Sequence, residues 1–452
     1  MARGLGKQDV DRELNVVFSA VFADLRPFVV EAVGALRWAD TPEDYVELTV
    51  TVLEQFLRHQ VAQEQVRERQ TERKDKLALL IAQSPRPIVK IRAINQEVKI
   101  DERFDHDLVC ALHALRGVGD GIAWRALDYD RRAISVMGDG RRVGRLADDK
   151  GLKAELDEMG RLWTQERRFA IHNDLTNCLR HGDLTIPGTL NGRAAVEVAE
   201  IKVSGREKSV QSSRLEDKLR FIRTGHRPAV GDGPADRILP PVPRLRTYQG
   251  LLREAIVLAR AQGYADFSPH QCLTFAVVDY DEVNRKPALG EDWALRAPRR
   301  RGWNPLQPRV IQLSNFTHRL RERHTSFPFL APYAIFPLAA EDVTDLILGM
   351  LDVCATLNCD ELQRTLAQAG LQSEVAGGRD AEHFFLRASD GKETITVPAV
   401  IREQMLTELM MPETLIETIR VSLAATSSDS AEQPANQLVP YAHEEAVWSG
   451  GS

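Results

Sequence analysis

Hydrophobic residues recur with helical spacing over the first part of the chain. The first amphipathic stretch contains Val16, Val17, Ala20, Val21 and Leu25. A second helix is expected to begin at Pro42, because proline is favoured in the first turn and the acidic Glu43 and Asp44 complement the helix dipole there. The pattern predicts an N-terminal helical region over residues 1–84.

The second predicted helix is densely charged. Acidic residues at 64, 68, 72 and 75 alternate with basic residues at 67, 69, 73, 74 and 76. Two interpretations stay open: a solvated helix with intrahelical ion pairs, or an arm for a protein partner or for homo-oligomerisation. The first is the simpler one. The sequence Ser84-Pro85-Arg86-Pro87 breaks the helix and marks a domain boundary.

A second domain is predicted over residues 88–285. The alternation of apolar residues from Ile88 to Ile100 predicts a short strand or hairpin, and a helix follows at 107–115. Residues 117–121 contain three glycines but lack both the GxGxxG spacing and a Lys-Ser/Thr pair, which predicts a connector and not a phosphate-binding loop. Residues 133–137 read as another short strand.

An amphipathic helix over 152–166 precedes two apolar runs that form a predicted hairpin. The first run opens at Asp183, the second spans about 194–203, and turn-forming residues lie between them. Because strand side chains alternate, Glu200 and Lys202 project from one side, and Asp183 can reach that side. Mg²⁺ prefers carboxylate oxygens and water, and a nearby ammonium can orient or deprotonate such a water.

This pattern, an aspartate followed 17 residues later by Glu-x-Lys in an apolar strand, resembles the PD-(D/E)XK nuclease superfamily. The resemblance implies a restriction-endonuclease-like α/β core, a central mixed sheet flanked by helices, beside the N-terminal helical domain and a C-terminal α/β unit. It also implies that Asp183 and Glu200 bind Mg²⁺, with Mn²⁺ as the alternative, and that Lys202 serves catalysis. Gly182 stands where the motif has proline.

Other site members stay open under the same resemblance. Glu155 or Glu166 of the preceding helix would add an acid to the metal site, and Gln211 matches a glutamine that some relatives keep. A helix predicted at about 210–222 carries Arg214, Lys218 and Arg220, and two interpretations of it stay open: a surface that lines a phosphate backbone, or a merely solvated helix. A surface hairpin with an ordinary Glu/Lys pair is the alternative to the whole interpretation.

The rest of the chain completes the predicted organisation. A helix at 248–262 and a buried strand at 272–279 would close the nuclease core. Arginines at 296 and 299–301 lie near Trp293 and Trp303, which suits either nucleic-acid binding or a surface loop. Residues 309–424 predict an α/β domain with helices at 340–356, 360–369 and 398–409 and strands at 383–387 and 393–397. Residues 425–452 predict a disordered tail.

Composition narrows the class of protein. The 452 residues are 43% hydrophobic and 27% charged, as in ordinary globular proteins, and the net charge of −6 gives no global basic field for nucleic acid. The five scattered cysteines contain no Cys-x-x-Cys pair, and no signal peptide or membrane-spanning run is evident. We expect a cytoplasmic protein without a membrane partner.

The leading hypothesis is a Mg²⁺-dependent deoxyribonuclease with DNA as its partner, serving bacterial defence or DNA processing by analogy. A non-catalytic nucleic-acid-binding or scaffold protein that keeps the fold is the alternative, and a nuclease acting on RNA is a third. The sequence names neither a recognition site nor endo- or exonuclease action.

Overall fold

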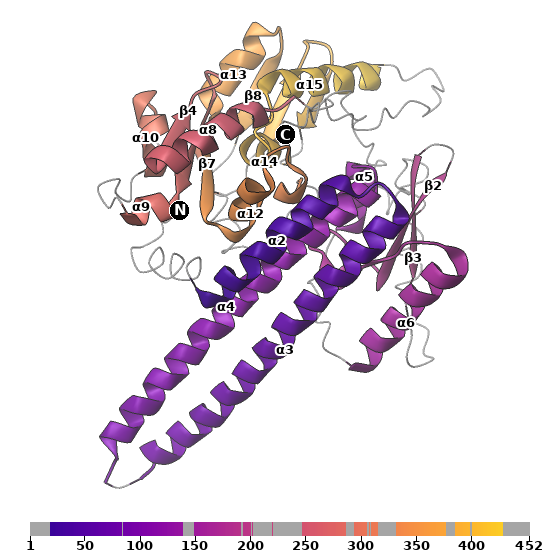
Figure 1. The fold of residues 1–452 in the computed structure, drawn as a ribbon. Helices are drawn as coiled ribbons and strands as arrows, with labels where there is room; N and C mark the ends of the chain where they lie inside the picture. The colour runs from indigo at the N-terminus through magenta and orange to yellow at the C-terminus, as the bar shows by residue number, and fades with distance from the viewer. Residues whose placement is uncertain are drawn as a thin grey trace.

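The computed structural model describes residues 19–83, 85–138, 149–190, 193–199, 201, 219, 246–285, 293–304, 307, 309–314, 331–376, 385–397 and 400–427. Its architecture is mixed α/β: helices at the N-terminal end are followed by small antiparallel sheets with helices (Figure 1).

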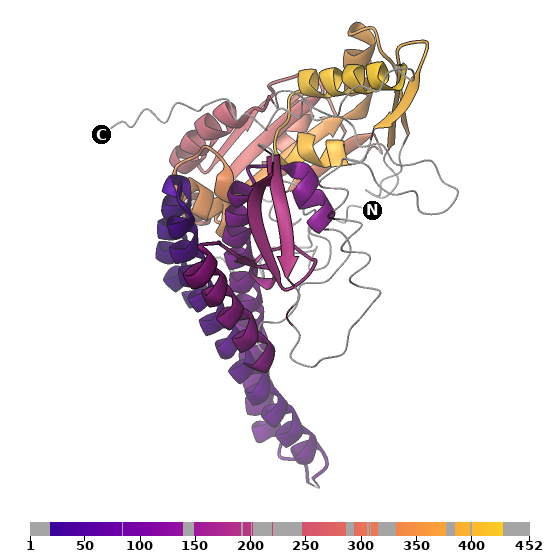
Figure 2. The same ribbon diagram turned by 90° about the vertical axis from the view of Figure 1, so that its right-hand side faces the viewer.

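From residue 19, where the described N-terminal part begins, the chain forms the helices α2 (Ala20–Trp38), α3 (Pro42–Ile81) and α4 (Ile88–Ala126). As expected, Pro42 opens α3, where Thr41 and Asp44 form a capping box. α3 and α4 form a long antiparallel hairpin whose far end projects away from the rest of the molecule (Figures 1 and 2).

The prediction of a strand at 88–100 and of a connector at 117–121 is wrong, because both stretches belong to the continuous helix α4. Ile94 and Val98 are buried in α4, and their spacing fits one helix face as well as it fits a strand. Residues 131–137 also form a helix, α5 (Arg131–Met137), and not the expected strand.

The glycines of α4 permit close packing inside a helix. A Cβ on Gly119 would lie 2.0 Å from the carbonyl oxygen of Leu175, and a Cβ on Gly121 would lie 2.6 Å from the Cβ of Ala334. Glycine is therefore required here by neighbouring backbone and side chains, and not by a flexible turn.

The predicted helix is confirmed, and the predicted hairpin is confirmed as far as Ala199. The second strand was expected to run to about residue 203, but Ile201 is not part of a strand, and residues 200, 202 and 203 lie outside the described residues. Helix α6 (Asp149–Glu166) precedes a three-stranded antiparallel sheet of β1 (Ile171–His172), β2 (Leu184–Leu190) and β3 (Arg193–Ala199), with β2 in the middle. β2 runs on through Pro187 and Gly188, so the turn is shorter than the sequence suggested. The 3-10 helix η1 (Asn173–Leu175) lies between β1 and β2.

A second sheet has the order β4-β5-β7-β6 and is antiparallel throughout. Its strands are β4 (Tyr264–Phe267), β5 (Leu273–Asp279), β6 (Val310–Ser314) and β7 (Leu351–Asn358). The predicted helix at 248–262 and buried strand at 272–279 are found as α8 (Gln249–Gln262) and β5. However, β5 does not pair with the hairpin, so the described strands do not form the single central mixed sheet that we expected.

The C-terminal part contains helices and a third antiparallel sheet. The sheet has the order β10-β9-β8, with β8 (Gln372–Ala376), β9 (Phe385–Ser389) and β10 (Thr394–Val397). The other elements are α9 (Tyr280–Arg285), α10 (Trp293–Arg300), η3 (Tyr333–Ile335), α12 (Ala340–Leu348), α13 (Cys359–Gln368), α14 (Val400–Thr407) and α15 (Pro412–Ser427).

Two expectations for this C-terminal part need correction. The helix predicted at 340–356 ends at Leu348, and the buried strand β7 follows, since Gly349 adopts a φ of +78° that terminates the helix. The segment expected to be a tail from 425 begins inside α15, which extends to Ser427; residues 428–452 lie outside the described residues.

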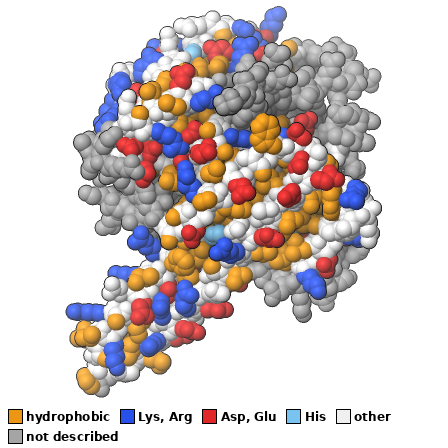
Figure 3. All heavy atoms as spheres, in the orientation of Figure 1, with side chains coloured by type: hydrophobic (Ala, Val, Ile, Leu, Met, Phe, Trp, Pro, Cys, Tyr) orange, Lys and Arg blue, Asp and Glu red, His pale blue; other side chains and the backbone are white. Residues whose placement is uncertain are grey.

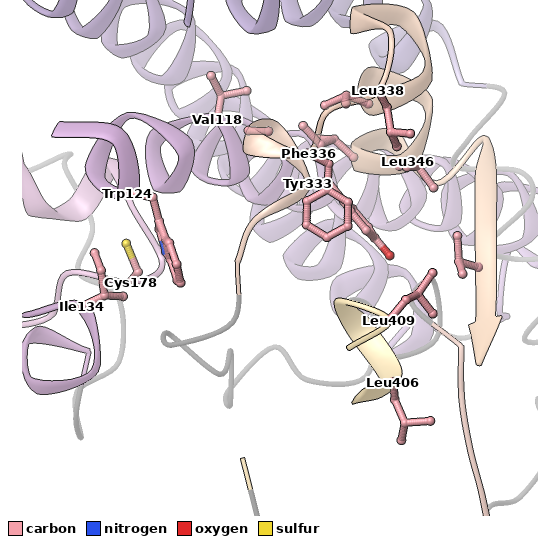
Figure 4. Packing of buried hydrophobic residues seen from close by; sticks show 14 of the residues in the cluster. Val118, Trp124, Ile134, Cys178, Tyr333, Phe336, Leu338, Leu346, Leu406 and Leu409 are labelled. Atoms are coloured by element: carbon pink, nitrogen blue, oxygen red, sulfur yellow. The ribbon is translucent and has the colours of Figure 1, made fainter. Parts of the chain in front are cut away.

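The main hydrophobic cluster runs from α2 to α15, and Figure 4 shows part of it, with Trp124 of α4, Phe336 and Leu409 among its members. Ion pairs between buried carboxylates and partly exposed arginines join distant elements. Asp345 of α12 binds Arg26 of α2 at 2.7 Å and Arg260 of α8 at 2.8 Å, and Glu408 binds Arg131 of α5. The elements are thus linked by both apolar and charged contacts.

Candidate functional site around Asp183

Asp183 lies directly before β2, the middle strand of its sheet. Its carboxylate oxygen Oδ2 accepts a hydrogen bond of 2.6 Å from the backbone N–H of Ile201, and its own N–H donates to the carbonyl of Ala199 at 3.0 Å. Its carbonyl accepts from the N–H of Asn173 at 3.0 Å. The neighbouring backbone therefore fixes both the main chain and the carboxylate of Asp183.

These contacts bring Asp183 next to the predicted Glu-x-Lys motif. Ala199 and Ile201, which precede and follow Glu200 in the sequence, are both hydrogen-bonded to Asp183. The register agrees, because Leu184 pairs with Ala199. Glu200, Lys202 and Gln211 themselves lie outside the described residues, as does the predicted helix at 210–222 apart from Leu219.

Gly182 explains the one departure from the family motif. Its φ is +73°, whereas proline is restricted to a φ near −65°. A Cβ at this position would lie 2.2 Å from Cγ1 of Val198 on β3. A proline therefore does not fit before Asp183 in this chain.

Asn173 supports the turn that precedes Asp183, a role that sequence reasoning missed. Its side-chain amide donates to the carbonyls of His181 at 2.7 Å and Gly182 at 3.1 Å. The hydroxyl of Thr185 donates to its side-chain oxygen at 2.7 Å. Asn173 and Thr185 are buried, so this network is shielded from water and holds the start of β2.

The same turn is anchored to α4 by a buried carboxylate. Asp120 accepts hydrogen bonds from the N–H groups of Asn177 and Cys178 and from the side-chain amide of Asn177, the last two at 2.8 and 2.9 Å. Burial raises the pKa of Asp120, and the hydrogen bonds from Asn177 act in the opposite direction. The segment between β1 and Asp183 is thus attached to the long helix.

Glu155 contacts a buried histidine. Its Oε2 lies 2.6 Å from Nε2 of His172, whose side chain is 1% exposed and whose Nδ1 has no hydrogen-bond partner in the described part of the chain. Leu184 and Ile186 pack against Leu162 of α6 on this side of the sheet. Because strand residues alternate, Asp183 belongs with the opposite face. The structure places Glu155 with His172 on the α6 side.

Glu166 belongs to a surface ion-pair group. Its carboxylate binds Arg161 at 2.7 Å and Arg168 at 3.2 Å. Hydrogen bonds from Arg161 and then Arg168 lower the pKa of Glu166. Arg168 also binds Glu197 of β3. Glu166 is therefore engaged with arginines of its own neighbourhood.

Arginines of the segment at 296–301 contact the protein itself, although Arg299, Arg300 and Arg301 are exposed residues. Arg300 binds Asp266 of β4 at 2.7 Å, and Arg296 lies 5.2 Å above the ring of Tyr264. Trp293 and Trp303, which would have offered stacking surfaces for bases, are both buried. The geometry favours the structural interpretation of this segment over a stacking platform for nucleic acid.

Within the described residues, no group of three or more His, Cys, Asp or Glu side chains is placed to hold a metal ion. None of the described helices has the length and hydrophobicity to cross a membrane. The chain matches no protein-family model, no curated protein and no solved structure.

Proposed function

We propose that the protein is a Mg²⁺-dependent nuclease that hydrolyses phosphodiester bonds of DNA. One observation supports this most directly: the carboxylate of Asp183 is hydrogen-bonded to Ile201, the residue between Glu200 and Lys202. The superfamily resemblance requires an acid at the start of one strand beside a Glu-x-Lys segment, and this hydrogen bond supports that arrangement.

The proposal assigns the restriction-endonuclease-like core to the unit α6–β1–β2–β3. A helix precedes the three strands, Asp183 lies directly before the second strand, and the third strand ends at Ala199, next to Glu200 in the sequence. By the same resemblance the physiological role is bacterial defence or DNA processing.

Asp183 is suited to a hard cation. It supplies carboxylate oxygens, the ligand type that Mg²⁺ or Mn²⁺ prefers, and the N–H of Ile201 fixes the orientation of one of them. Asp183 and Glu200 would hold the ion, which would stabilise negative charge on the scissile phosphate. Lys202 would position the attacking water or accept its proton.

A non-catalytic scaffold that keeps this fold is the second candidate. Glu155 and Glu166, the two additional acids considered for the metal site, are engaged with His172 and with arginines. This leaves Asp183 as the only one of the proposed acids within the described residues that is placed beside the motif strand. A scaffold would bind nucleic acid without cleaving it.

The test is cleavage of supercoiled plasmid, linear DNA and single-stranded RNA in Mg²⁺, in Mn²⁺ and in EDTA. We expect DNA cleavage that EDTA abolishes and that Asp183→Asn, Glu200→Gln and Lys202→Met each reduce by at least about 100-fold, as for loss of a catalytic group. Glu197→Gln is the matched control, because Glu197 lies on β3 near the motif and pairs with Arg168 at the surface.

Wild-type rates in all three motif variants would refute the assignment. If the wild-type protein cleaves no substrate, titration calorimetry with Mg²⁺ separates the candidates: absence of binding supports the scaffold, and binding lost in Asp183→Asn supports a metal site with another substrate. Preferential cleavage of the RNA would identify the protein as a ribonuclease.

A further inference from the structure

The α3–α4 hairpin has a thin interior where it projects from the molecule. Val66 is the last buried residue of α3, and Ile94 is the first buried residue of α4. Most of the surface of both helices in this stretch is exposed, and Figure 3 shows charged and hydrophobic side chains along it. We call this stretch, residues 61–104, the arm.

Ion pairs between α3 and α4 link the two helices of the arm. The pairs are Arg67–Asp105 at 2.9 Å, Arg69–Asp101 at 3.9 Å, Arg73–Glu97 at 3.2 Å and Lys74–Glu102 at 3.3 Å, and Arg73 also pairs with Asp101. In each of them α3 supplies the base and α4 the acid. The intrahelical pairing predicted for α3 therefore gives way to pairing across the hairpin. The exposed charged residues on the outward sides of the helices are mainly acidic on α3 and basic on α4.

The outward side of α3 carries one exposed stripe, here called the acidic face. It consists of Val61, Gln65, Glu68, Glu72, Asp75 and Leu79, spaced alternately four and three residues apart. Val61 is 53% exposed and Leu79 is 69% exposed. Lys76 lies beside the stripe, so three carboxylates and one ammonium group give this surface a net negative charge. The acidic face is therefore a stripe of acidic residues with an exposed apolar side chain at each end.

The outward side of α4 carries a stripe of opposite sign, here called the basic face. It consists of Val89, Arg92, Gln96, Lys99 and Arg103, spaced alternately three and four residues apart, and all are exposed. Val89 is 81% exposed, and the adjacent Ile100 is 60% exposed. The basic face covers about the same length of the arm as the acidic face, because the two helices run side by side.

We propose that the arm binds a second copy of this chain, with the acidic face of one copy against the basic face of the next. Charge complementarity selects this occupant: a nucleic acid or an anionic membrane would be attracted to the basic face and repelled by the acidic one. A second copy offers a surface of opposite charge to each face and covers the apolar side chains of both faces. Since the faces lie on opposite sides of the arm, the association is head-to-tail and leads to a ring or to longer assemblies.

The proposal is independent of nuclease activity, and sedimentation velocity of the full chain tests it. We expect the sedimentation coefficient of the wild type to rise with protein concentration at low salt and to fall back at high salt. Glu68→Lys with Glu72→Lys reverses the acidic face, and Arg92→Glu with Lys99→Glu reverses the basic face. Each double variant alone should remain a monomer.

An equimolar mixture of the two double variants should associate again, because the reversed faces then complement each other. The matched control is Asp24→Lys with Glu31→Lys, which makes the same charge change at exposed positions of α2 and should associate as the wild type does. Circular dichroism confirms that each variant is folded. A wild type that stays monomeric at low salt, double variants that still associate, or a mixture that does not would each overturn the proposal.

Discussion

Replacement of Asp120 by alanine tests how the segment that leads to Asp183 is held in place. Asp120 is 8% exposed, and its Oδ1 accepts the N–H groups of both Asn177 and Cys178 while its Oδ2 accepts the side-chain amide of Asn177. Alanine removes all three acceptors. The two backbone donors are held by the surrounding chain and cannot turn toward water.

The expected loss follows from the donors left behind. A buried donor without a partner costs about 1–3 kcal/mol. The side-chain amide of Asn177 has rotational freedom and relaxes, so the two backbone groups dominate, and we expect Asp120→Ala to lower the free energy of unfolding by roughly 2–6 kcal/mol. That is a large part of the stability of a typical domain.

Asp120→Asn is the matched control. Its side-chain oxygen can accept both backbone N–H groups, and the amide of Asn177 can turn so that its oxygen accepts from the new NH₂ group. The variant also removes a buried charge. We expect it to stay within about 1 kcal/mol of the wild type.

Urea unfolding followed by tryptophan fluorescence measures both variants, because Trp124 lies one helical turn from Asp120 and is fully buried. The free energy of unfolding comes from the midpoint and the slope of the transition. Equal stabilities of the alanine and asparagine variants, or a loss under about 1 kcal/mol in alanine, would show that these hydrogen bonds do not hold the segment.

Three further predictions address other parts of the molecule. Burial raises the pKa of Asp107 from 3.8 to about 6, so the folded state binds this proton more tightly than the unfolded state, and the free energy of unfolding should fall as pH rises from about 4 to about 6. In urea titrations at a series of pH values, Asp107→Asn should reduce this pH dependence of the free energy of unfolding. An unchanged pH dependence in the variant would contradict the prediction. Gly182→Ala should lower the melting temperature and DNA cleavage together, since its Cβ meets Val198. Gly160→Ala on the open side of α6 should instead raise the melting temperature slightly and leave cleavage unchanged, because alanine favours a helix interior over glycine. Lys202→Arg should bind Mg²⁺ yet cleave poorly at every pH if Lys202 acts as a base, because guanidinium stays protonated; retained cleavage would assign Lys202 to charge stabilisation alone.

Local sequence signals predicted much of the secondary structure. Pro42 with its capping residues, the apolar stripe of α6 and the turn residues between β2 and β3 each act through contacts a few residues apart. For the same reason the hairpin that brings Asp183 beside the Glu-x-Lys segment could be predicted, since its register depends on a short turn and on strand alternation.

The errors arose where a distant contact decides between two local patterns. Residues 88–100 show apolar spacing compatible with strand or helix, and packing against α3 selects the helix. The glycines of 117–121 resemble a connector in the sequence. In the structure Gly119 and Gly121 leave room for Leu175 and Ala334, which are distant in the chain. No window of sequence contains both partners of such a contact.

The amino-acid sequence by itself allowed prediction of the elements of the candidate site, the amphipathic helix α6 and the hairpin with Asp183, because local residue patterns specify their helix and strand periods. Only the tertiary structure decided which residues support that site. Asp120 and Asn173 reach the turn before Asp183 from positions that no motif marks, and β5 joins β4 and β7 in a separate sheet. The physical reason is that burial and hydrogen-bond satisfaction depend on the whole packed chain, whereas helix and strand patterns depend on neighbours.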